Sequence, residues 1–142
     1  MYMNPMGLQT ALITDIEESG RELMRLLIVD DEKNIRQLYA ADLQDAGYQV
    51  DTAENSATAV ELLNCHTFDL VVLDIHMGNE SGLDILQDIV QQKKDLPVIL
   101  CSAYSCYKED FSSWLADGYV VKSSNTSALK AEIERVLAKK KQ

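Results

Sequence analysis

Acidic, hydroxyl and basic side chains stand directly after four short apolar runs of this sequence. Asp30 and Asp31 follow the first run, and Asp74, Ser102 and Lys122 each follow a later one. Three carboxylates brought close together repel one another, so such a site needs a bound cation or retained protons. Because every ligand is an oxygen and open positions remain for water, the expected cation is Mg²⁺. Mg²⁺, an ammonium group and a hydroxyl donor are the electrostatic parts of phosphoryl transfer, with one carboxylate as the nucleophile.

Each of these residues also has an ordinary structural explanation. Asp30 and Asp31 precede an expected helix, where carboxylates cap free amides and meet a favourable dipole. Ser102 suits a cap as well, Lys122 a solvated position and Asp74 an exposed loop. Capping does not explain why all of these residues follow strands of one sheet, so their combination favours a functional site.

The elements that must position these residues alternate between short apolar runs and stretches of helical period from Met24 onward. This alternation is typical of repeated strand-helix units that build a parallel sheet. Helical spacing gives the first and last helices one apolar stripe each. The predicted strands are 25–29, 48–52, 70–73, 98–101 and 119–121, and the stripes are Ile35, Leu38, Tyr39, Leu43 and Ala46, then Leu129, Ile133, Val136 and Leu137.

The order of the strands follows from their polarity. Three strands are apolar throughout, as in strands that helices cover on both faces, whereas strand 48–52 alternates apolar and polar residues and is predicted to be an edge. This agrees with a doubly wound α/β sheet of order 2-1-3-4-5, although another order with the same edge stays open. Right-handed crossovers then place helices on both faces, and ligands bind at the carboxyl ends of the strands.

Composition excludes several classes of protein. The 142 residues have room for one domain, and 23 acids against 13 bases give a net charge of −10 that disfavours direct binding to nucleic acid or anionic lipid. No apolar run approaches the roughly 20 residues of a membrane span, so no membrane insertion is expected. The N-terminus lacks the basic and apolar regions of a secretory signal, and the three cysteines fit reduced thiols. We therefore expect a cytoplasmic protein.

Residues 1–23 do not fit the strand-helix repeat, so we expect an N-terminal extension followed by one domain over 24–142. Leu8, Leu12 and Ile16 share a helical spacing that suits a short amphipathic helix. Gly20 and the short length favour a frayed tail equally well. Met24 is also a plausible true start of the protein.

From about Met24 to Lys140 the chain resembles the receiver domain of two-component response regulators, including the single-domain chemotaxis regulator. The resemblance rests on several motifs in order at matching strand ends, and it implies a flavodoxin-like fold. The motifs are Leu27-Ile28-Val29-Asp30-Asp31-Glu32, Val71-Val72-Leu73-Asp74-Ile75-His76-Met77, Gly82, Ile99-Leu100-Cys101-Ser102-Ala103 and Gly118-Tyr119-Val120-Val121-Lys122.

The resemblance implies a role for each residue of the site. Asp74 is the expected phospho-acceptor, and Mg²⁺ is expected to bind Asp30, Asp31, Asp74 and the backbone carbonyl of His76. Lys122 is expected to contact the phosphoryl oxygens. The expected switch residues are Ser102, which bonds to the phosphoryl group after transfer, and Tyr119, the aromatic residue that follows its movement.

The resemblance also implies partners. A sensor histidine kinase or a phosphotransfer protein supplies the phosphoryl group, and its added charge shifts an equilibrium between two loop arrangements. The signal passes to a downstream protein through the fourth helix, the fifth strand and the fifth helix. Since the sequence ends at Gln142, just after the last helix, we expect a stand-alone receiver whose output is another protein, or a relay or phosphate sink. No enzymatic activity beyond self-phosphorylation and self-dephosphorylation is expected.

Three places depart from the family pattern. Gly78 stands where proline is usual, and we expect only altered mobility of that loop. Ser123 replaces the proline that follows the lysine, whose preceding bond is typically cis in this family. Because a cis bond without proline costs about 3 to 4 kcal/mol, we predict either a trans Lys122-Ser123 bond with a shifted lysine or a strained cis bond. His76 and Tyr104 occupy positions that vary in the family and tune the lifetime of the phosphorylated state.

Other classes of function stay open. A degenerate receiver would act as an interaction module that needs no phosphorylation, but the complete set of acids, serine and lysine argues against it. A phosphatase with an aspartyl nucleophile usually has a second acid two residues later, where this sequence has His76. A flavin-binding protein would need a hydroxyl-rich phosphate loop after the first strand, and Asp30-Asp31-Glu32 would repel phosphate.

Overall fold

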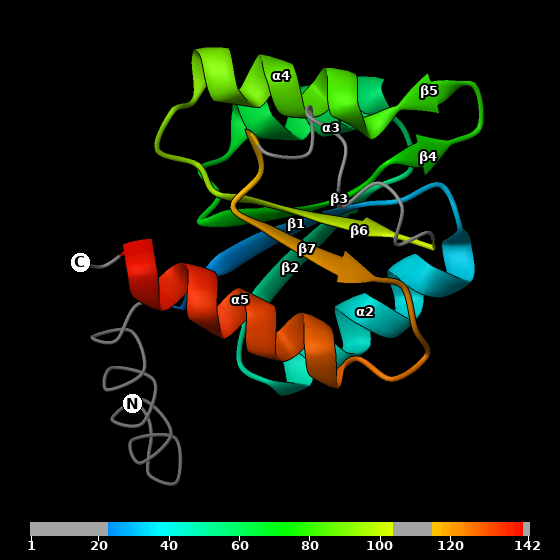
Figure 1. Cartoon of the computed structure of the whole chain (residues 1–142), viewed down its shortest axis with the longest axis vertical. Helices are drawn as coiled ribbons and strands as arrows, with labels where there is room; N and C mark the ends of the chain where they lie inside the picture. Colours follow the sequence, from blue (N-terminus) through cyan, green and yellow to red (C-terminus); the bar gives the residue numbers. More distant parts are fainter. Residues whose placement is uncertain (1–22, 104–114, 141–142) are drawn as a thin grey trace, which may run out of the picture.

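A five-stranded parallel sheet forms the centre of the protein, as Figure 1 shows for the computed structural model, which describes residues 23–103 and 115–140. The sheet has the order β2-β1-β3-β6-β7, which confirms the predicted order, with strand two at the edge. Each predicted strand agrees with the observed one to within one residue at either end. The strands are β1 (Arg25–Val29), β2 (Gln49–Ala53), β3 (Leu70–Asp74), β6 (Val98–Ser102) and β7 (Gly118–Val121).

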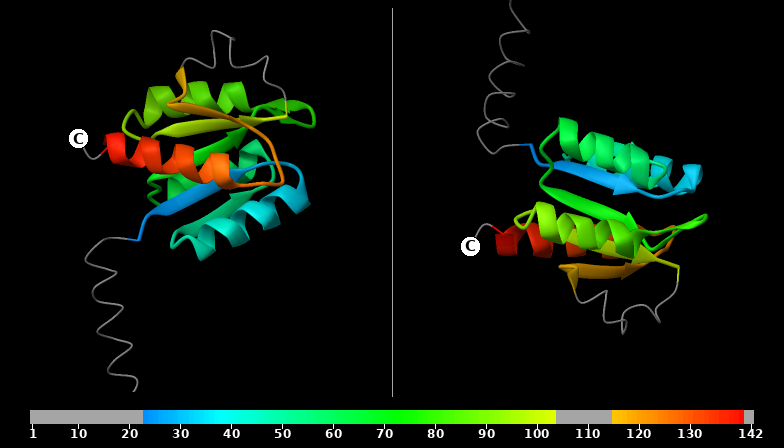
Figure 2. Two further views of the ribbon diagram at one scale, coloured as in Figure 1. Left: turned by 60° about the horizontal axis from the view of Figure 1, so that its bottom comes forward. Right: turned by 90° about the horizontal axis from the view of Figure 1, so that it is seen from above.

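Helices cover both faces of this sheet. In Figure 1, α3 (Ser56–Cys65) and α4 (Gly82–Gln92) lie above the sheet, and α2 (Lys33–Asp45) and α5 (Ser127–Lys140) lie below it. The two views of Figure 2 agree, since α2 and α5 come forward when the bottom is turned to the viewer, and α3 and α4 are nearest from above. The two layers of helices therefore cover the faces of the sheet and leave the ends of its strands uncovered.

The core consists of two apolar clusters, one on each face of the sheet. Alternate residues of each central strand point to opposite faces, so Leu27 and Val71 pack with α3 and α4, whereas Ile28 and Val72 pack with α2 and α5. The strands β1, β3 and β6 are almost wholly buried, which explains their continuous apolar sequence. The predicted stripe of the last helix is confirmed, because Leu129, Ile133, Val136 and Leu137 are all buried.

A short hairpin after β3 is a feature that periodicity did not predict. β4 (His76–Met77) pairs with the antiparallel β5 (Glu80–Ser81) through a two-residue turn. Gly78 begins this turn with φ of 59°, in the left-handed region that proline cannot adopt. Glycine at position 78 therefore suits this tight turn, and the expected change in the mobility of the loop stays a prediction.

The hairpin is fastened to the start of α3. Ser56 donates its backbone N–H to Glu80 Oε1 at 2.9 Å and its hydroxyl to Glu80 Oε2 at 2.5 Å. Asn55, the residue before α3, accepts the N–H of Thr58 with its side chain, so two side chains satisfy free amides at this helix start. The loop after Asp74 is thus tied to a second element.

Some expectations fall outside the described residues. These are the extension over 1–22, the side chains of Tyr104 and Cys106, and the fourth helix of the expected output face. In the described part of the chain, Cys65 and Cys101 are free thiols. Among the helices of residues 23–103 and 115–140, none has the length and apolar character needed to cross a membrane.

Candidate phosphoryl-transfer site

Lys122 lies at the centre of a cluster of acids at the carboxyl edge of the sheet. Its Nζ is 2.8 Å from Asp30 Oδ2, 3.0 Å from Asp74 Oδ2 and 3.1 Å from Glu32 Oε1. The carboxylates of Asp30 and Asp74 are buried, whereas that of Glu32 is exposed. Residues at the carboxyl ends of three different strands therefore meet in one ion-pair network, as predicted for Asp30, Asp74 and Lys122.

The second oxygen of each buried carboxylate accepts a backbone amide. Asp30 Oδ1 accepts the N–H of Glu32 at 2.8 Å, and Asp74 Oδ1 accepts the N–H of His76 at 3.2 Å. The structural explanation for Asp30, a bond to free amides before the helix, is thus partly correct, because one of its oxygens does this. Each carboxylate is thus oriented by the amide of a residue two positions later and by the Lys122 ammonium, which comes from a distant part of the sequence.

Burial and mutual repulsion change the acidity of this network. Burial, together with the charge of Asp30, raises the pKa of Asp74 to about 6, although the ammonium of Lys122 opposes the shift. Burial also raises the pKa of Asp30, and hydrogen bonds from Lys122 and from the Glu32 amide oppose it. For Lys122 burial lowers the pKa, but its hydrogen bonds to Asp30 and Asp74 outweigh burial and raise it. The lysine is charged at neutral pH, and Asp74 is largely ionised.

An oxygen-rich group of acids beside this network fits a divalent cation. Asp30, Asp31 and Glu32 each place a carboxylate oxygen within 4.8 Å of the others, and Asp31 and Glu32 open to solvent. Mg²⁺ takes oxygen ligands in an octahedron at about 2.0–2.1 Å and keeps several waters, which such a partly exposed group allows. The donor set therefore fits Mg²⁺ at Asp30 and Asp31. Glu32 is a further acid in this group, and the family resemblance assigned no role to it.

The remaining predicted residues lie on three further strands, His76 on β4, Ser102 on β6 and Tyr119 on β7. Ser102 ends β6, is almost fully buried, and its carbonyl accepts the Lys122 N–H at 2.7 Å. Tyr119 lies on β7 and packs, partly buried, against the cluster beneath α3 and α4. His76 is exposed next to the acceptor. The switch roles of Ser102 and Tyr119 and the metal ligand at the His76 carbonyl stay predictions.

Gly82 has a steric role behind the acceptor. A Cβ at this position would lie 1.9 Å from the carbonyl oxygen of Asp74 and 2.9 Å from its carbonyl carbon. The Gly82 N–H also donates to the Ile75 carbonyl at 2.8 Å, which draws the start of α4 against the end of β3. Only glycine permits this close approach, so the motif residue Gly82 sets the packing under Asp74.

The peptide bond that follows Lys122 corrects one expectation. No peptide bond among the described residues is cis, so the Lys122-Ser123 bond is trans. Lys122 nevertheless reaches Asp74 at 3.0 Å. The trans bond of the first alternative is therefore confirmed and the strained cis bond is wrong, while the lysine is not found far from Asp74.

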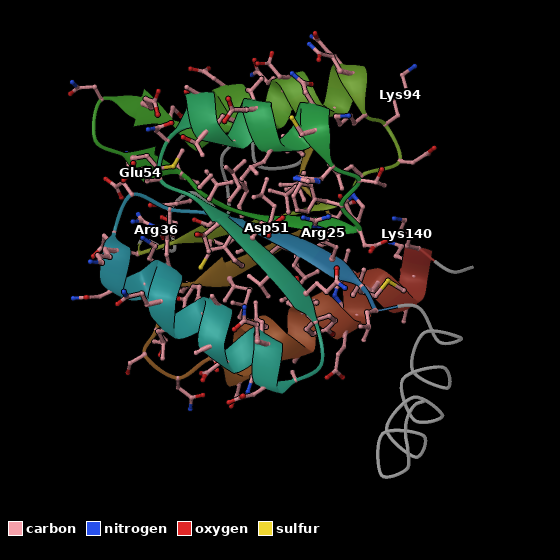
Figure 3. The ribbon with its side chains drawn as sticks, turned by 180° about the vertical axis from the view of Figure 1, so that it is seen from behind. Arg25, Arg36, Asp51, Glu54, Lys94 and Lys140 are labelled. Atoms are coloured by element: carbon pink, nitrogen blue, oxygen red, sulfur yellow. The ribbon has the colours of Figure 1, made fainter. Side chains whose placement is uncertain are left out.

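The edge strand β2 stays outside the site, as predicted. Its side chains make other contacts, since Asp51 accepts two bonds from Arg25 of β1, at 2.6 and 3.0 Å. Glu54, which follows β2, lies 3.9 Å from Arg36 of α2, and Figure 3 shows both pairs from behind the sheet. Arg36 also donates to the Asp30 carbonyl at 2.8 Å, so it supports the backbone of the site.

Residues 26–134 match the response regulator receiver domain family, and the chain belongs to this family. The resemblance stated from the motifs is thereby confirmed. The sheet order and the cluster of Asp30, Asp74 and Lys122 at its carboxyl edge agree with that membership. The protein is a receiver domain of two-component signalling.

Solved structures of receivers are similar to this chain over most of its length. The response regulator protein TrrA from Thermotoga maritima, in complex with Mg²⁺-BeF, is 47% identical, with a TM-score of 0.77 over 80% of this chain and 99% of that one. In the complex of histidine kinase ThkA with TrrA, the matched chain is 48% identical, with a TM-score of 0.76, over 81% of this chain and 99% of that one.

Curated relatives are longer than the matched region. The probable transcriptional regulator ycf27 of Cyanidium caldarium is 35% identical over 114 residues, which is 79% of this chain and 45% of that protein. This chain therefore spans less than half the length of ycf27. The similarity concerns the receiver and not the rest of that regulator.

Proposed function

We propose that this receiver accepts a phosphoryl group on Asp74 and passes the resulting change of surface to a partner protein. The observation that carries the proposal is the Lys122 ammonium between the buried carboxylates of Asp30 and Asp74. Burial of this set costs free energy that a merely structural role does not require, because removing charged groups from water carries a desolvation penalty even when they are paired. A site for a charged reaction accounts for that cost.

In the proposed reaction, one oxygen of ionised Asp74 attacks the phosphorus of the donor. The new O–P bond forms as the bond from phosphorus to the donor's histidine nitrogen breaks, which leaves an acyl phosphate on Asp74. Lys122, whose pKa is raised, stays protonated and offsets the charge of the phosphoryl oxygens. Asp30, Asp31, Asp74 and the His76 carbonyl would hold Mg²⁺, which when bound would add positive charge near those oxygens.

The donor and the output are proposed by similarity. TrrA, 47–48% identical to this chain, is known in complex with Mg²⁺-BeF and with the histidine kinase ThkA. We therefore propose a sensor histidine kinase or a phosphotransfer protein as the donor, and Mg²⁺ as the cofactor. Ser102 and Tyr119 are proposed to couple the new charge to a face that includes β7 and α5, for a downstream protein and without direct binding to nucleic acid. The proposed location is the cytoplasm, and the proposed chemistry ends with self-phosphorylation and self-dephosphorylation.

The test is the intact mass of the purified protein after incubation with Mg²⁺ and acetyl phosphate. The wild type is expected to gain one phosphoryl group and Asp74→Ala none, while Asp45→Ala, which removes an exposed acid of α2, behaves as the wild type. If the wild type gains no mass and beryllofluoride leaves its spectrum unchanged, the domain acts instead as an interaction module that needs no phosphorylation.

A further inference from the structure

The segment after Lys122 is tied to α2 at two points. Thr126 donates its hydroxyl to Asp42 Oδ2 at 2.7 Å, and the Tyr39 hydroxyl donates to the Ser123 carbonyl over a longer 3.4 Å. Thr126 is 6% exposed and Tyr39 is 2% exposed, so one end of each contact is buried, whereas Asp42 is half-buried and Ser123 is exposed. These residues are 84 positions apart in the sequence, and each bond joins α2 to the loop that begins at the lysine.

The segment after Lys122 also bonds to β6 and contains hydrogen bonds between its own residues. The Lys122 N–H donates to the Ser102 carbonyl at 2.7 Å, which fixes the backbone where the loop begins. Ser123 Oγ accepts the N–H of Asn125 at 3.1 Å, and Asn125 Oδ1 accepts the N–H of Ser127 at the start of α5. A proline at position 123 would have no hydroxyl to accept from Asn125. The trans loop is therefore bonded from the lysine to the last helix.

A lysine needs such support in order to hold one position. Its four-carbon side chain has large rotamer freedom, and the Nζ of Lys122 is directed at three acids only while its own backbone stays fixed. Ser123 lacks the ring that would restrict this backbone. The bond that Tyr39 donates to Ser123 and the bond that Asp42 accepts from Thr126 supply this restriction from a neighbouring helix.

We propose that Tyr39, Asp42 and Thr126 are positioning residues that clamp the trans Lys122-Ser123 segment to α2 and so hold the Lys122 ammonium between Asp30 and Asp74. This inference rests on the proposed function, in which Lys122 contacts the phosphoryl group. The effect of the three clamp residues passes through the backbone of residues 122–126.

The principal test replaces Thr126 by Val, which keeps the shape of the side chain and removes its hydroxyl. Loss of one hydrogen bond to a charged group is expected to lower the initial rate of phosphorylation by acetyl phosphate and the affinity for beryllofluoride by about tenfold. Mg²⁺ affinity, which depends on the acids, is expected to stay at the wild-type value. Thr126→Ser keeps the hydroxyl and is expected to restore both rate and affinity.

A double-mutant cycle identifies the partner. Asp42→Ala is expected to cause the same loss as Thr126→Val, and the two together no more than either alone, because they break one bond. Asp45→Asn removes a charge from the exposed face of the same helix and is expected to change nothing. Additive losses would show that Asp42 and Thr126 act separately and would overturn the clamp.

A second measurement, which does not depend on phosphorylation, is the ¹⁵N relaxation of the Lys122 side-chain nitrogen. This nitrogen is expected to be more mobile in Thr126→Val than in the wild type. If the wild type accepts no phosphoryl group but the variant still loosens Lys122, the proposed function fails and the clamp stands. If the wild type is phosphorylated while the variant keeps its rate and its lysine order, the clamp alone is overturned. An equal loss of Mg²⁺ affinity would also overturn it, since that indicates general damage to the site.

Discussion

Lys122 Nζ lies 3.0 Å from Asp74 Oδ2 although the peptide bond that follows the lysine is trans. The family resemblance associates this position with proline and a cis bond, so contact between the lysine and the acceptor is reached here by another backbone route. In this backbone conformation the Ser123 carbonyl accepts a hydrogen bond from the Tyr39 hydroxyl of α2. One substitution in the motif is thus accommodated without loss of the central ion pair.

Neutralising Asp74 is expected to stabilise the protein in the absence of metal. The pKa of Asp74 is raised from 3.8 to about 6, so folding favours its protonated form, and the stability linked to that proton is full below about pH 4 and lost as pH rises through 6. At pH 7 Asp74→Asn should therefore be more stable than the wild type by up to about 3 kcal/mol. Urea unfolding in EDTA at pH 7 and at pH 4 measures this difference, which should vanish at the lower pH. A variant less stable than the wild type at pH 7 would contradict it.

Mg²⁺ is expected to raise the melting temperature of the wild type. Binding to the folded state alone at ten times the dissociation constant adds about 1.4 kcal/mol. Asp31→Asn removes one exposed carboxylate of the acid group and should abolish the rise, whereas Asp45→Asn on α2 should retain it. A thermal melt of the wild type that does not respond to Mg²⁺ would rule out the acid group as a metal site.

A side chain at position 82 should disrupt the acceptor strand. Gly82→Ala places a methyl group 1.9 Å from the Asp74 carbonyl oxygen, so backbone must move, at a cost of about 3 kcal/mol or more. Gly118→Ala is the matched control, because its nearest neighbour is the Glu132 carboxylate, the end of a side chain that can turn away. Chemical denaturation compares the two, and equal losses of stability would show that the backbone contact has no special effect.

The usual proline is expected to be harmful at position 78. Gly78 has φ of 59°, which proline cannot adopt, so Gly78→Pro should destabilise the protein by about 1–3 kcal/mol and release Glu80 from Ser56. Gly78→Asn should cost less, since asparagine tolerates the left-handed region. The free energies of unfolding of the two variants test this order, and a proline variant as stable as the wild type would show that the turn is not required.

Much of the site followed from the sequence by itself. Apolar runs of strand length, separated by helical stripes, predicted a parallel sheet, and in such a sheet the residues that follow neighbouring strands meet at one edge. That rule placed Asp30, Asp74, Ser102 and Lys122 together without any knowledge of distances. It depends only on chain direction and on recognising short apolar runs as strands, both of which can be read in a linear sequence.

Tertiary structure decided how those residues are held. Three features depend on which groups approach one another in space. They are the ion pair of Lys122 with a third acid, Glu32, the need for glycine against the Asp74 carbonyl, and the hydrogen bond from Thr126 to Asp42. The last pair is separated by 84 residues, and no periodicity relates them. Periodicity records which face of an element is apolar, whereas the position of an ammonium group depends on backbone geometry and on contacts between distant elements.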